Sequence, residues 1–560
     1  MTATKYSIRR GAYYDSVVLM QLQRGLIGLP GIVDAGVVMA TPANCDLLAA
    51  NKLLPDSITA SPDDLLIVVK AETDSSAEDA MSQIDSLLAR RRSSVSQDFR
   101  PRSLSGAAKQ LPEANWVLVS VPGRYAAGVA REALELGKHV FLYSDNVSIE
   151  EEVSLKKLAR EKGLLVMGPD CGTAIINGIG LGFANRVRRG AIGVVGASGT
   201  GTQAVTAHIH NLGEGISHAI GTGGRDLKSD VGAITALQAL DLLARDPETN
   251  IIVLISKPPS SEVATNLLSA AQSTGKPVVV DFIGYPPPAR RLDNLHFATS
   301  LGEAASLAVD IRNQTSREEI PQKPPREVST LYIRGLFSGG TLAYETMLGL
   351  QATLSPLYSN APISDNQILR DPLHSEHHTI IDLGDEFFMV GRLHPMIDND
   401  LRVRRMKQEA ADPEVGLILF DVVLGEGSHP DPASELVPVI EEIGKERPDV
   451  RFVGIVIGTE EDPQNLPSQI EQLAKAGVHV CRSVTEAVEY ISLQQNAASQ
   501  DKFMPVDLET LKQPLAAINV GLESFFDSLI SQGAQAVQVD WRPPAGGNER
   551  LASLLAKMKK

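Results

Sequence analysis

Two short stretches with the same pattern constrain the fold of this chain more than any other feature. GASGTGTQAVTA spans residues 196–207, and GLFSGGTLAYET spans residues 335–346. Each follows a short apolar run and leads into a segment with helical spacing, which predicts a strand, a turn of small residues and the beginning of a helix. The first-turn amides of a helix have no partner inside it, and its dipole is positive at that end. Each stretch is therefore either an ordinary strand-to-helix turn or one half of an anion-binding site.

We expect both turns to contact the same anion. Their glycines let the backbone approach a ligand closely, and their hydroxyl groups either cap the helix or donate to a phosphate or carboxylate. Because similar turns stand at the head of two similar half-chains, we predict that the two helix ends face each other and hold one phosphoryl or acyl-phosphate group. The candidate phosphate-binding residues are Ser198, Gly199, Thr200, Gly201 and Thr202 in the first turn and Ser338, Gly339, Gly340 and Thr341 in the second.

Length and charge narrow the class of protein. A chain of 560 residues is too long for one core and predicts three to five domains. With 52 basic and 68 acidic residues, the net charge of -16 argues against nucleic acid or an anionic membrane as the main partner. No apolar run approaches a membrane span, and the first residues lack the apolar core of a signal peptide. Cys45, Cys171 and Cys481 are far apart and lack metal-ligand spacing, so we expect a cytoplasmic protein.

Strands and helices alternate along the chain, which predicts a multidomain α/β fold: a small ferredoxin-like unit followed by doubly wound parallel sheets. The third large unit repeats the second, because DPEVGLILFDVVLG parallels DPETNIIVLISKPP in the same order of elements. We expect regulation or assembly from the first unit, and docking on the body or on a partner from the last, whose Trp541 cannot be buried in so short a piece. The expected units are residues 1–98, 106–185, 190–313, 328–495 and 503–560.

Ligands of doubly wound sheets bind at the carboxyl ends of the strands, and several polar loops lie there. We expect substrate contacts from the GPDCGT loop, namely Gly168, Pro169, Asp170 and Cys171. Arg225 in GTGGRDL and Arg392 in VGRLHP occupy comparable loops of the two half-chains. A guanidinium forks onto a carboxylate or an oxyanion, so both are catalytic candidates, with a surface ion pair as the alternative. Asp226, Asp382 and Asp385 are candidates to orient them.

His394, directly before Pro395, is the first candidate for proton transfer. Cys171 is an alternative nucleophile, but the sequence shows no base beside it. The segment HSEHH at 374–378 contains a histidine pair with metal-ligand spacing on a helix. Its flanking residues instead predict a loop that enters a strand, so we expect no metal site.

Several of these motifs resemble one family. GPDCGT, GAIGVVGASGTGT, AIGTGGRDL and KPVVVDFIGYPPPARR are similar to the α subunit of succinyl-CoA synthetase, and the third large unit resembles the ligase domain of its β subunit. Over nearly the whole chain, including GAYYDSVVLM and VVMATPAN, the sequence more specifically resembles the FdrA family. The resemblance implies a CoA-binding-like Rossmann-type domain at 106–185 and flavodoxin-like ligase domains at 190–313 and 328–495. It also implies a subunit of the oxamate carbamoyltransferase of allantoin degradation, which converts oxalurate and phosphate to oxamate and carbamoyl phosphate.

The chain departs from the synthetase at the parts that use ATP. No segment has the length or pattern of an ATP-grasp module. The Gly-rich phosphate loop at the start of the synthetase's CoA domain has no match either. The synthetase's phosphorylated histidine has no match, because His296 in PPPARRLDNLHFATS is shifted and reads as a histidine in the core or at a sheet edge. Carbamoyl transfer between two anions requires in principle no metal, covalent nucleophile or cofactor, with phosphate as a substrate and CoA as a possible ligand.

Three hypotheses follow for this chain and its small anionic substrate. The first is a carbamoyltransferase component that works in an oligomer with other subunits. The second is a subunit of an ADP-forming acyl-CoA ligase, which would need a separate ATP-grasp chain. The third is a non-catalytic scaffold or regulator.

Overall fold

The computed structural model divides the chain into two units, residues 1–498 and 499–560, which are described separately. The residues that the structure describes are 3–10, 16–40, 44–45, 48–49, 53–54, 60–61, 64–89, 101, 103–121, 123–285, 289–314, 331–351, 353–389, 392–496, 516–520, 527, 530–531 and 535–539.

The N-terminal part is a small antiparallel sheet covered by helices. Strands β1 (Ala3–Arg9), β2 (Ile32–Met39) and β3 (Leu65–Ala71) pair in the order β1-β3-β2. Helices α1 (Ser16–Ile27) and α3 (Asp74–Ala89) connect to this sheet and share an apolar cluster with it. Strand β3 lies between β1 and β2, as in a ferredoxin-like unit, which is the arrangement that the sequence predicts.

A parallel sheet of three strands follows, in the order β4-β5-β6. The alanines of one helix, among them Ala126, Ala130 and Ala133, pack with Val140 of the sheet. The elements are α4 (Leu104–Gln110), β4 (Trp116–Val119), α5 (Gly123–Glu135), β5 (His139–Leu142), α6 (Ile149–Glu161) and β6 (Val166–Met167).

The next sheet has eight strands in the order β13-β14-β12-β11-β9-β10-β7-β8. Two of its strands precede Gly190, so the boundary that we expected between 185 and 190 falls inside this sheet. Each of the two strands has only four residues, which is too short for a periodic pattern, so the sequence did not reveal them. The elements are β7 (Thr173–Ile176), β8 (Ile179–Gly182), β9 (Arg189–Gly196), α7 (Gly199–Asn211), β10 (Ile216–Gly221), α8 (Ile234–Arg245), β11 (Ile251–Ser256), α9 (Ser261–Ser273), β12 (Val278–Phe282), β13 (Arg291–Leu292), β14 (Leu295–Phe297) and α10 (Leu301–Asn313).

The last large sheet has six strands in the order β16-β17-β15-β18-β19-β20, and every adjacent pair in it is parallel. Its elements are β15 (Tyr332–Phe337), α11 (Gly340–Leu350), β16 (Leu357–Ser359), η1 (Asp365–Gln367), β17 (His378–Asp382), α12 (Glu386–Met389), α13 (Asp400–Ala410), β18 (Val415–Val423), α14 (Pro432–Glu446), β19 (Arg451–Ile457), α15 (Leu466–Lys475), β20 (Val478–Cys481) and α16 (Val484–Asn496).

The two large sheets are built alike, which confirms the duplication predicted from the sequence. The order β14-β12-β11-β9-β10 in one matches β20-β19-β18-β15-β17 in the other, position by position along the chain. In each sheet the chain leaves its first central strand, β9 or β15, and later returns to the other side of that strand. Ligands of such sheets bind outside the strand end where the order reverses. Helices α7 and α11 begin at those two points.

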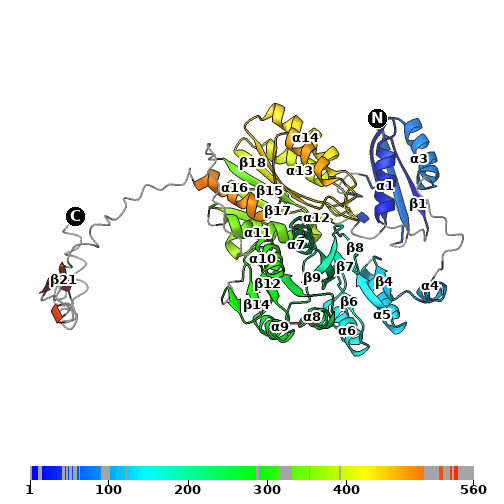
Figure 1. Cartoon of the computed structure of the whole chain (residues 1–560). Coiled ribbons are helices and arrows are strands. Elements are labelled where there is room, and N and C mark those ends of the chain that lie inside the picture. The colour runs from blue at the N-terminus through cyan, green and yellow to red at the C-terminus, as the bar shows by residue number, and fades with distance from the viewer. Residues whose placement is uncertain are drawn as a thin grey trace, which may run out of the picture. The chain divides into compact units, whose positions relative to one another are not determined.

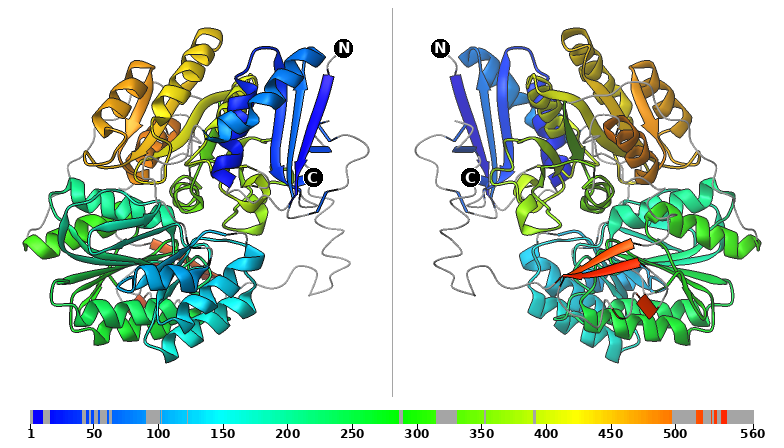
Figure 2. Two further views of the ribbon diagram at one scale, coloured as in Figure 1. Left: turned by 90° about the vertical axis from the view of Figure 1, so that its right-hand side faces the viewer. Right: turned by 90° about the vertical axis from the view of Figure 1, so that its left-hand side faces the viewer.

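One apolar core joins the two large sheets. Val205 of α7, Ala305 of α10, Met347 of α11 and Ala487 of α16 belong to a single buried cluster with strands of both sheets. Figure 1 shows these helices between the green and the yellow sheets, and the turned views agree (Figure 2). Helices α8 and α9 pack on the opposite face of the eight-stranded sheet, and α13 and α14 on that of the six-stranded sheet. The shared core fixes the beginnings of α7 and α11 relative to each other.

The C-terminal unit contains a parallel pair of strands, β21 (Ala516–Val520) and β22 (Gln535–Val539). The second is the strand that we predicted in AQAVQVDW. Trp541 and the expected terminal helix lie outside the described residues, so docking by this unit stays a prediction. In the part of the chain that the structure describes, no helix combines the length and the apolar character needed to cross a bilayer.

Candidate active site

The two predicted turns lie against each other. Ser198 is the N-cap of α7, and Gly339 is the N-cap of α11. The hydroxyl groups of Ser198 and Thr341 form a hydrogen bond of 2.6 Å between the two helix ends. A Cβ atom added to Gly339 would lie 2.4 Å from Thr200 Cγ2, which is closer than real Cβ contacts. The two helices therefore meet at their N-termini, and glycine is required at 339 for that approach.

The two helix ends differ in how their amides are used. In α7 the Gly201 N–H donates to Ser198 Oγ at 3.0 Å, an ordinary cap. In α11 the N-cap Gly339 supplies no side chain, so the amides of Gly340 and Thr341 have no acceptor in their own helix and none among the described residues. Among the described residues the amides of Gly199 and Thr200 at the beginning of α7 have no acceptor either, so free donors remain at both helix ends, with one more amide capped in α7.

Two of the predicted phosphate contacts are wrong because their hydroxyls are already bonded inside the protein. Ser338 is 1% exposed, and its hydroxyl and N–H donate to the two oxygens of Asp421 at 2.8 and 2.7 Å. Asp421 in turn pairs with buried Arg402 at 2.9 Å. Thr202 is fully buried, and its hydroxyl donates to the Ser198 carbonyl at 2.6 Å. Both residues shape the turns and cannot contact an anion.

A lysine that the sequence did not single out lies at the paired ends. A Cβ atom added to Gly340 would lie 3.4 Å from Lys257 Nζ and 2.3 Å from Asp382 Oδ2. Lys257 directly follows β11, and among the described residues its ammonium makes no ion pair within 4.0 Å. Burial raises the pKa of Asp382 to about 6, and the charge of Lys257 opposes that rise. In the sequence, the one sign that Lys257 belongs to the site is its position at the carboxyl end of a strand.

His394 lies in the same region. A Cβ atom added to Gly384 would lie 3.2 Å from His394 Nε2, 3.2 Å from Asp382 Oδ1 and 2.7 Å from the Ser338 carbonyl. His394 Nδ1 accepts a hydrogen bond from the Met396 N–H at 3.2 Å, which leaves the ring proton on Nε2. Burial lowers the pKa of His394 to about 4, with Arg402 adding to the effect. At neutral pH this side chain is therefore a hydrogen-bond donor.

The GPDCGT loop borders α7, but its residues divide into accessible and buried ones. Cys171 is 2% exposed, its Sγ lies 3.6 Å from the Thr173 carbonyl, and burial raises its thiol pKa to about 12. Gly168 and Pro169 are also buried. These three positions form the floor of the loop, so direct substrate contact by the Cys171 thiol is ruled out by its burial.

Asp170 is the member of that loop whose side chain reaches solvent, although many protein atoms surround its carboxyl. Burial of its carboxyl by surrounding atoms, with the negative charges of Asp145 and Glu386, raises its pKa to about 6, against the opposing charges of Arg225 and Lys257. Lys257 thus acts electrostatically on both Asp170 and Asp382.

Thr173, which we did not single out, lies where the loop meets α7. A Cβ atom added to Gly199 would lie 3.5 Å from Thr173 Oγ1 and 3.6 Å from the Gly172 Cα. Thr173 Oγ1 is buried, and within the described ranges it has no hydrogen-bond partner. A buried hydroxyl without a partner is costly unless a ligand or water satisfies it.

The two predicted arginines are placed differently. Arg225 pairs with buried Glu152 at 2.9 Å and donates to the Val147 carbonyl at 2.8 Å, so it is tied into the structure. Next to it, Asp226 pairs with fully buried Lys156 at 2.7 Å and does not orient either arginine. Arg392 is exposed, and its guanidinium has no ion pair or hydrogen bond to the described residues. Of the two, Arg392 is free to bind an anion.

The remaining histidines do not form a metal centre. His374 pairs with Asp371, His377 with the Tyr332 hydroxyl, and His378 accepts from the Ile333 N–H, so each has its own partner. Among the described residues no group of three or more His, Cys, Asp or Glu is arranged to hold a metal ion. His296 lies on β14 between β12 and β13, as expected of a histidine within a sheet.

Comparisons with known proteins agree with this architecture. A CoA-ligase model matches residues 336–493, and a CoA binding domain model matches residues 187–284. The second match falls on the eight-stranded sheet, whereas we expected the CoA-binding-like unit at 106–185. A third model, the heavy metal-associated domain of AllF, matches residues 1–102.

Two kinds of relative match the chain, one over most of its length and the other over about a third of it. YahF of Escherichia coli, described as uncharacterised, is 41% identical over 498 residues, which is 86% of this chain and 97% of YahF. The α subunit of ADP-forming succinate–CoA ligase from Aquifex aeolicus is 28% identical over 186 residues, covering 32% of this chain and 60% of that subunit. The mitochondrial α-2 subunit from Trichomonas vaginalis is 29% identical over 203 residues, covering 35% and 64%. The chain thus spans less than two thirds of either α subunit.

The paired ligase-type sheets and these matches define a succinyl-CoA synthetase-like α/β protein. Within that class, the chain belongs to the family that includes YahF.

Proposed function

We propose that this chain is a subunit of a phosphate-dependent carbamoyltransferase, which converts oxalurate and phosphate to oxamate and carbamoyl phosphate. The observation that carries the proposal is the contact between the N-termini of α7 and α11, where the Gly340 and Thr341 amides have no acceptor among the described residues and Lys257 adds a positive charge. The match of residues 1–102 to a domain of AllF supports a role in allantoin degradation, the pathway that the resemblance to the FdrA family implies. In this proposal the chain works with other subunits in an oligomer and needs no cofactor.

The transfer step makes defined demands on the site. A phosphate oxygen attacks the terminal carbamoyl carbon of oxalurate, a C–O bond forms, and the C–N bond to oxamate breaks. The proton of hydrogen phosphate ends on the oxamate nitrogen, so atoms and charge balance without a cofactor. Positioning of the two anions and donors for the oxyanion supply the catalysis.

Each role has a candidate among the described residues. The Gly340 and Thr341 amides, together with Lys257, hold the phosphate. The His394 Nε2–H serves as a donor to the oxyanion, because that ring is neutral at pH 7. Arg392 binds the substrate carboxylate. Asp382, with its pKa raised to about 6, relays the proton between phosphate and the leaving nitrogen.

Reconstitution of the complex tests the proposal. Carbamoyl phosphate should form from oxalurate only when phosphate and this chain are both present, and it should form without ATP. No carbamoyl phosphate in the complete complex, with each subunit shown to be folded, would remove the proposal.

An acyl-CoA ligase subunit is the second candidate, because the matching models are of CoA-ligase and CoA-binding type. Formation of a CoA thioester that needs ATP, in the presence of an ATP-grasp chain, would favour it. The two reactions are distinguished by their requirement for CoA and ATP.

A further inference from the structure

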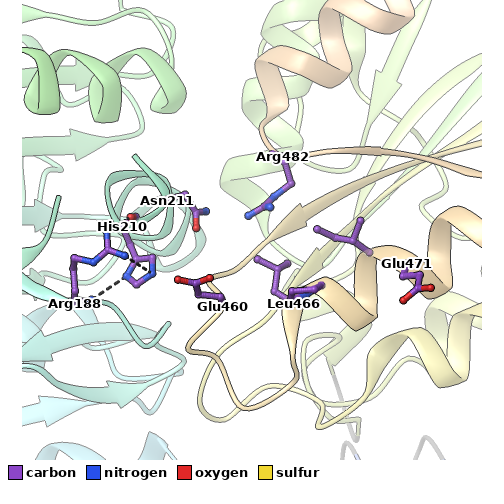
Figure 3. Close-up of a pocket in the computed structure, with 9 residues that line it drawn as sticks. Arg188, His210, Asn211, Glu460, Leu466, Glu471 and Arg482 are labelled. Carbon is purple, nitrogen blue, oxygen red and sulfur yellow. Dashed lines mark hydrogen bonds between the residues drawn. The ribbon is translucent and has the colours of Figure 1, made fainter. Parts of the chain in front are cut away.

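A cavity of about 490 Å³ lies between the two large sheets, at the end of α7 that is remote from the paired helix ends. Arg188, His210 and Asn211 line it from one side, and Glu460, Leu466 and Arg482 from the other. Figure 3 shows Arg482 pointing across this space toward Asn211, with Glu460 below them. Because α7 has 13 residues, the cavity lies roughly 20 Å from the candidate active site. Its volume is in the range of small-molecule sites.

The cavity contains two guanidinium groups that have no carboxylate partner in the part of the chain that the structure describes. Arg482 donates to the carbonyls of Val456 and Gly458 at 3.3 and 3.1 Å, and Arg188 donates to the His210 carbonyl at 2.6 Å. No carboxylate of the described residues lies within 4.0 Å of either guanidinium, although the charge of Glu486 partly offsets that of Arg482. Neutral groups hold both arginines in place, namely carbonyl oxygens and, for Arg188, also the His210 ring at 3.4 Å. Their positive charge stays available to a ligand.

The histidine of the cavity, His210, adds no charge to it. Burial and the neighbouring charge of Arg188 lower the pKa of His210, against the opposing charges of Glu461, Glu460 and Asp462, so the ring is uncharged at neutral pH. Its Nδ1 accepts from the Arg188 N–H at 3.0 Å, which fixes the ring beside that arginine.

The opposite wall has different chemistry. Leu466, Pro467 and Ile470, at the beginning of α15, present apolar surface. Glu471 is neutralised by Lys475 at 2.6 Å, whereas the Glu460 carboxylate has no partner in the described parts of the chain. Glu460 can therefore accept an N–H group from a bound molecule.

We propose that this cavity binds a small organic anion that carries a planar or apolar body with an N–H donor. The anionic group binds the Arg482 guanidinium on the side that faces Asn211, and the charge of Arg188 beside His210 adds to the attraction. The body packs on Leu466 and Ile470, and the N–H group donates to Glu460. A nucleoside monophosphate and an amino-substituted aromatic carboxylate both have this chemistry. The site is separate from the paired helix ends and does not depend on the function proposed above.

Calorimetric titration of the full chain tests the site with defined probes. AMP offers a phosphate with a planar body, 4-aminobenzoate offers a carboxylate with one, and adenosine lacks the anion. We expect one molecule of AMP or 4-aminobenzoate to bind per chain, with the tighter of the two identifying phosphate or carboxylate as the preferred group. Adenosine should bind at least tenfold more weakly than AMP.

Variants assign the binding to the cavity. Arg482→Met should weaken binding of the preferred probe at least tenfold, Arg482→Lys should retain most of it, and Ile470→Trp, which fills the apolar side, should abolish it. Exposed Lys157→Met and exposed Arg160→Met, both on α6, should leave it unchanged. Melting curves establish that each variant is folded. Absence of binding of both anionic probes to the wild-type chain, or wild-type affinity in folded Arg482→Met and Ile470→Trp, would overturn the proposal.

Discussion

The charge of Lys257 influences several groups of the candidate active site. Its ammonium lies beside the first amide of α11, and it favours the charged forms of both Asp170 and Asp382. It also lies 5.9 Å from the centroid of the Tyr344 ring, which holds the long side chain over α11. Removal of this charge should therefore weaken anion binding and raise both carboxyl pKa values.

Replacement of Lys257 by Met should raise the KM for phosphate at least tenfold, because one of the main charges facing the anion is lost. The acidic limb of the pH–rate profile should move to higher pH, since the Asp382 pKa rises. Steady-state kinetics against phosphate concentration measure both effects. Lys157→Met, an exposed lysine on α6, is the matched control. An unchanged KM in the Lys257 variant would exclude its contact with phosphate.

Glu345 predicts a pH dependence of stability. It is 7% exposed; one oxygen accepts from the Leu301 N–H at 3.0 Å, and the other has no partner among the described residues. Burial raises its pKa from 4.5 to about 7. Below pH 4.5 both the folded and unfolded states are protonated. Between there and pH 7 only the unfolded chain loses the proton, so stability falls as pH rises, by on the order of 3 kcal/mol.

Glu345→Gln should remove this loss, because the amide stays neutral and its oxygen can still accept from Leu301. Its Tm should exceed that of the wild type at pH 8 and approach or fall below it at pH 5. Melting curves across this range provide the measurement. The same Tm difference at both pH values would contradict a raised pKa of Glu345.

At the scale of elements, the site depends on how closely two helices approach. The contact between Gly339 and Thr200 leaves no room for a side chain, and the hydrogen bond between Ser198 and Thr341 crosses the same junction. A shared apolar core behind the helices fixes the distance. Any side chain at 339 must therefore separate the helix ends or displace Thr200.

Gly339→Val should lower phosphate-dependent activity by about 100-fold, because a shift of about 1 Å in a reacting group has that effect. Gly128→Ala is a suitable control, since an added Cβ there meets nothing within 4 Å. Kinetics and melting curves of the two variants separate a local shift from loss of the fold. Wild-type activity in folded Gly339→Val would show that close approach of the helices is not needed.

The duplication at the scale of the whole molecule explains which features were predictable from the sequence. The strand-turn-helix units of Ser198 and Gly339 were recognisable because glycine, serine and apolar spacing act locally. Lys257 was missed because it lies on another strand end, and only the sheet order brings it to Gly340. Ser338 cannot bind an anion because it bonds to Asp421, which is 83 positions away in the sequence. This too is a tertiary contact that the sequence pattern does not reveal.

The boundary before the eight-stranded sheet shows the same limit. Strands β7 and β8 have only four residues each. They join the sheet as an antiparallel pair through β7, which pairs with β10, and a reading of strand-helix alternation does not anticipate this. The repeated order of the five matching strands was predictable, because both halves keep the same succession of apolar runs.

A structure of this chain with bound phosphate tests the central claim most directly. One phosphate should lie at the joined N-termini of α7 and α11, within hydrogen-bond distance of the Gly340 amide and of Lys257 Nζ. If phosphate at saturating concentration bound elsewhere and left the two helix ends without an anion, the result would contradict an anion site formed by the two helices.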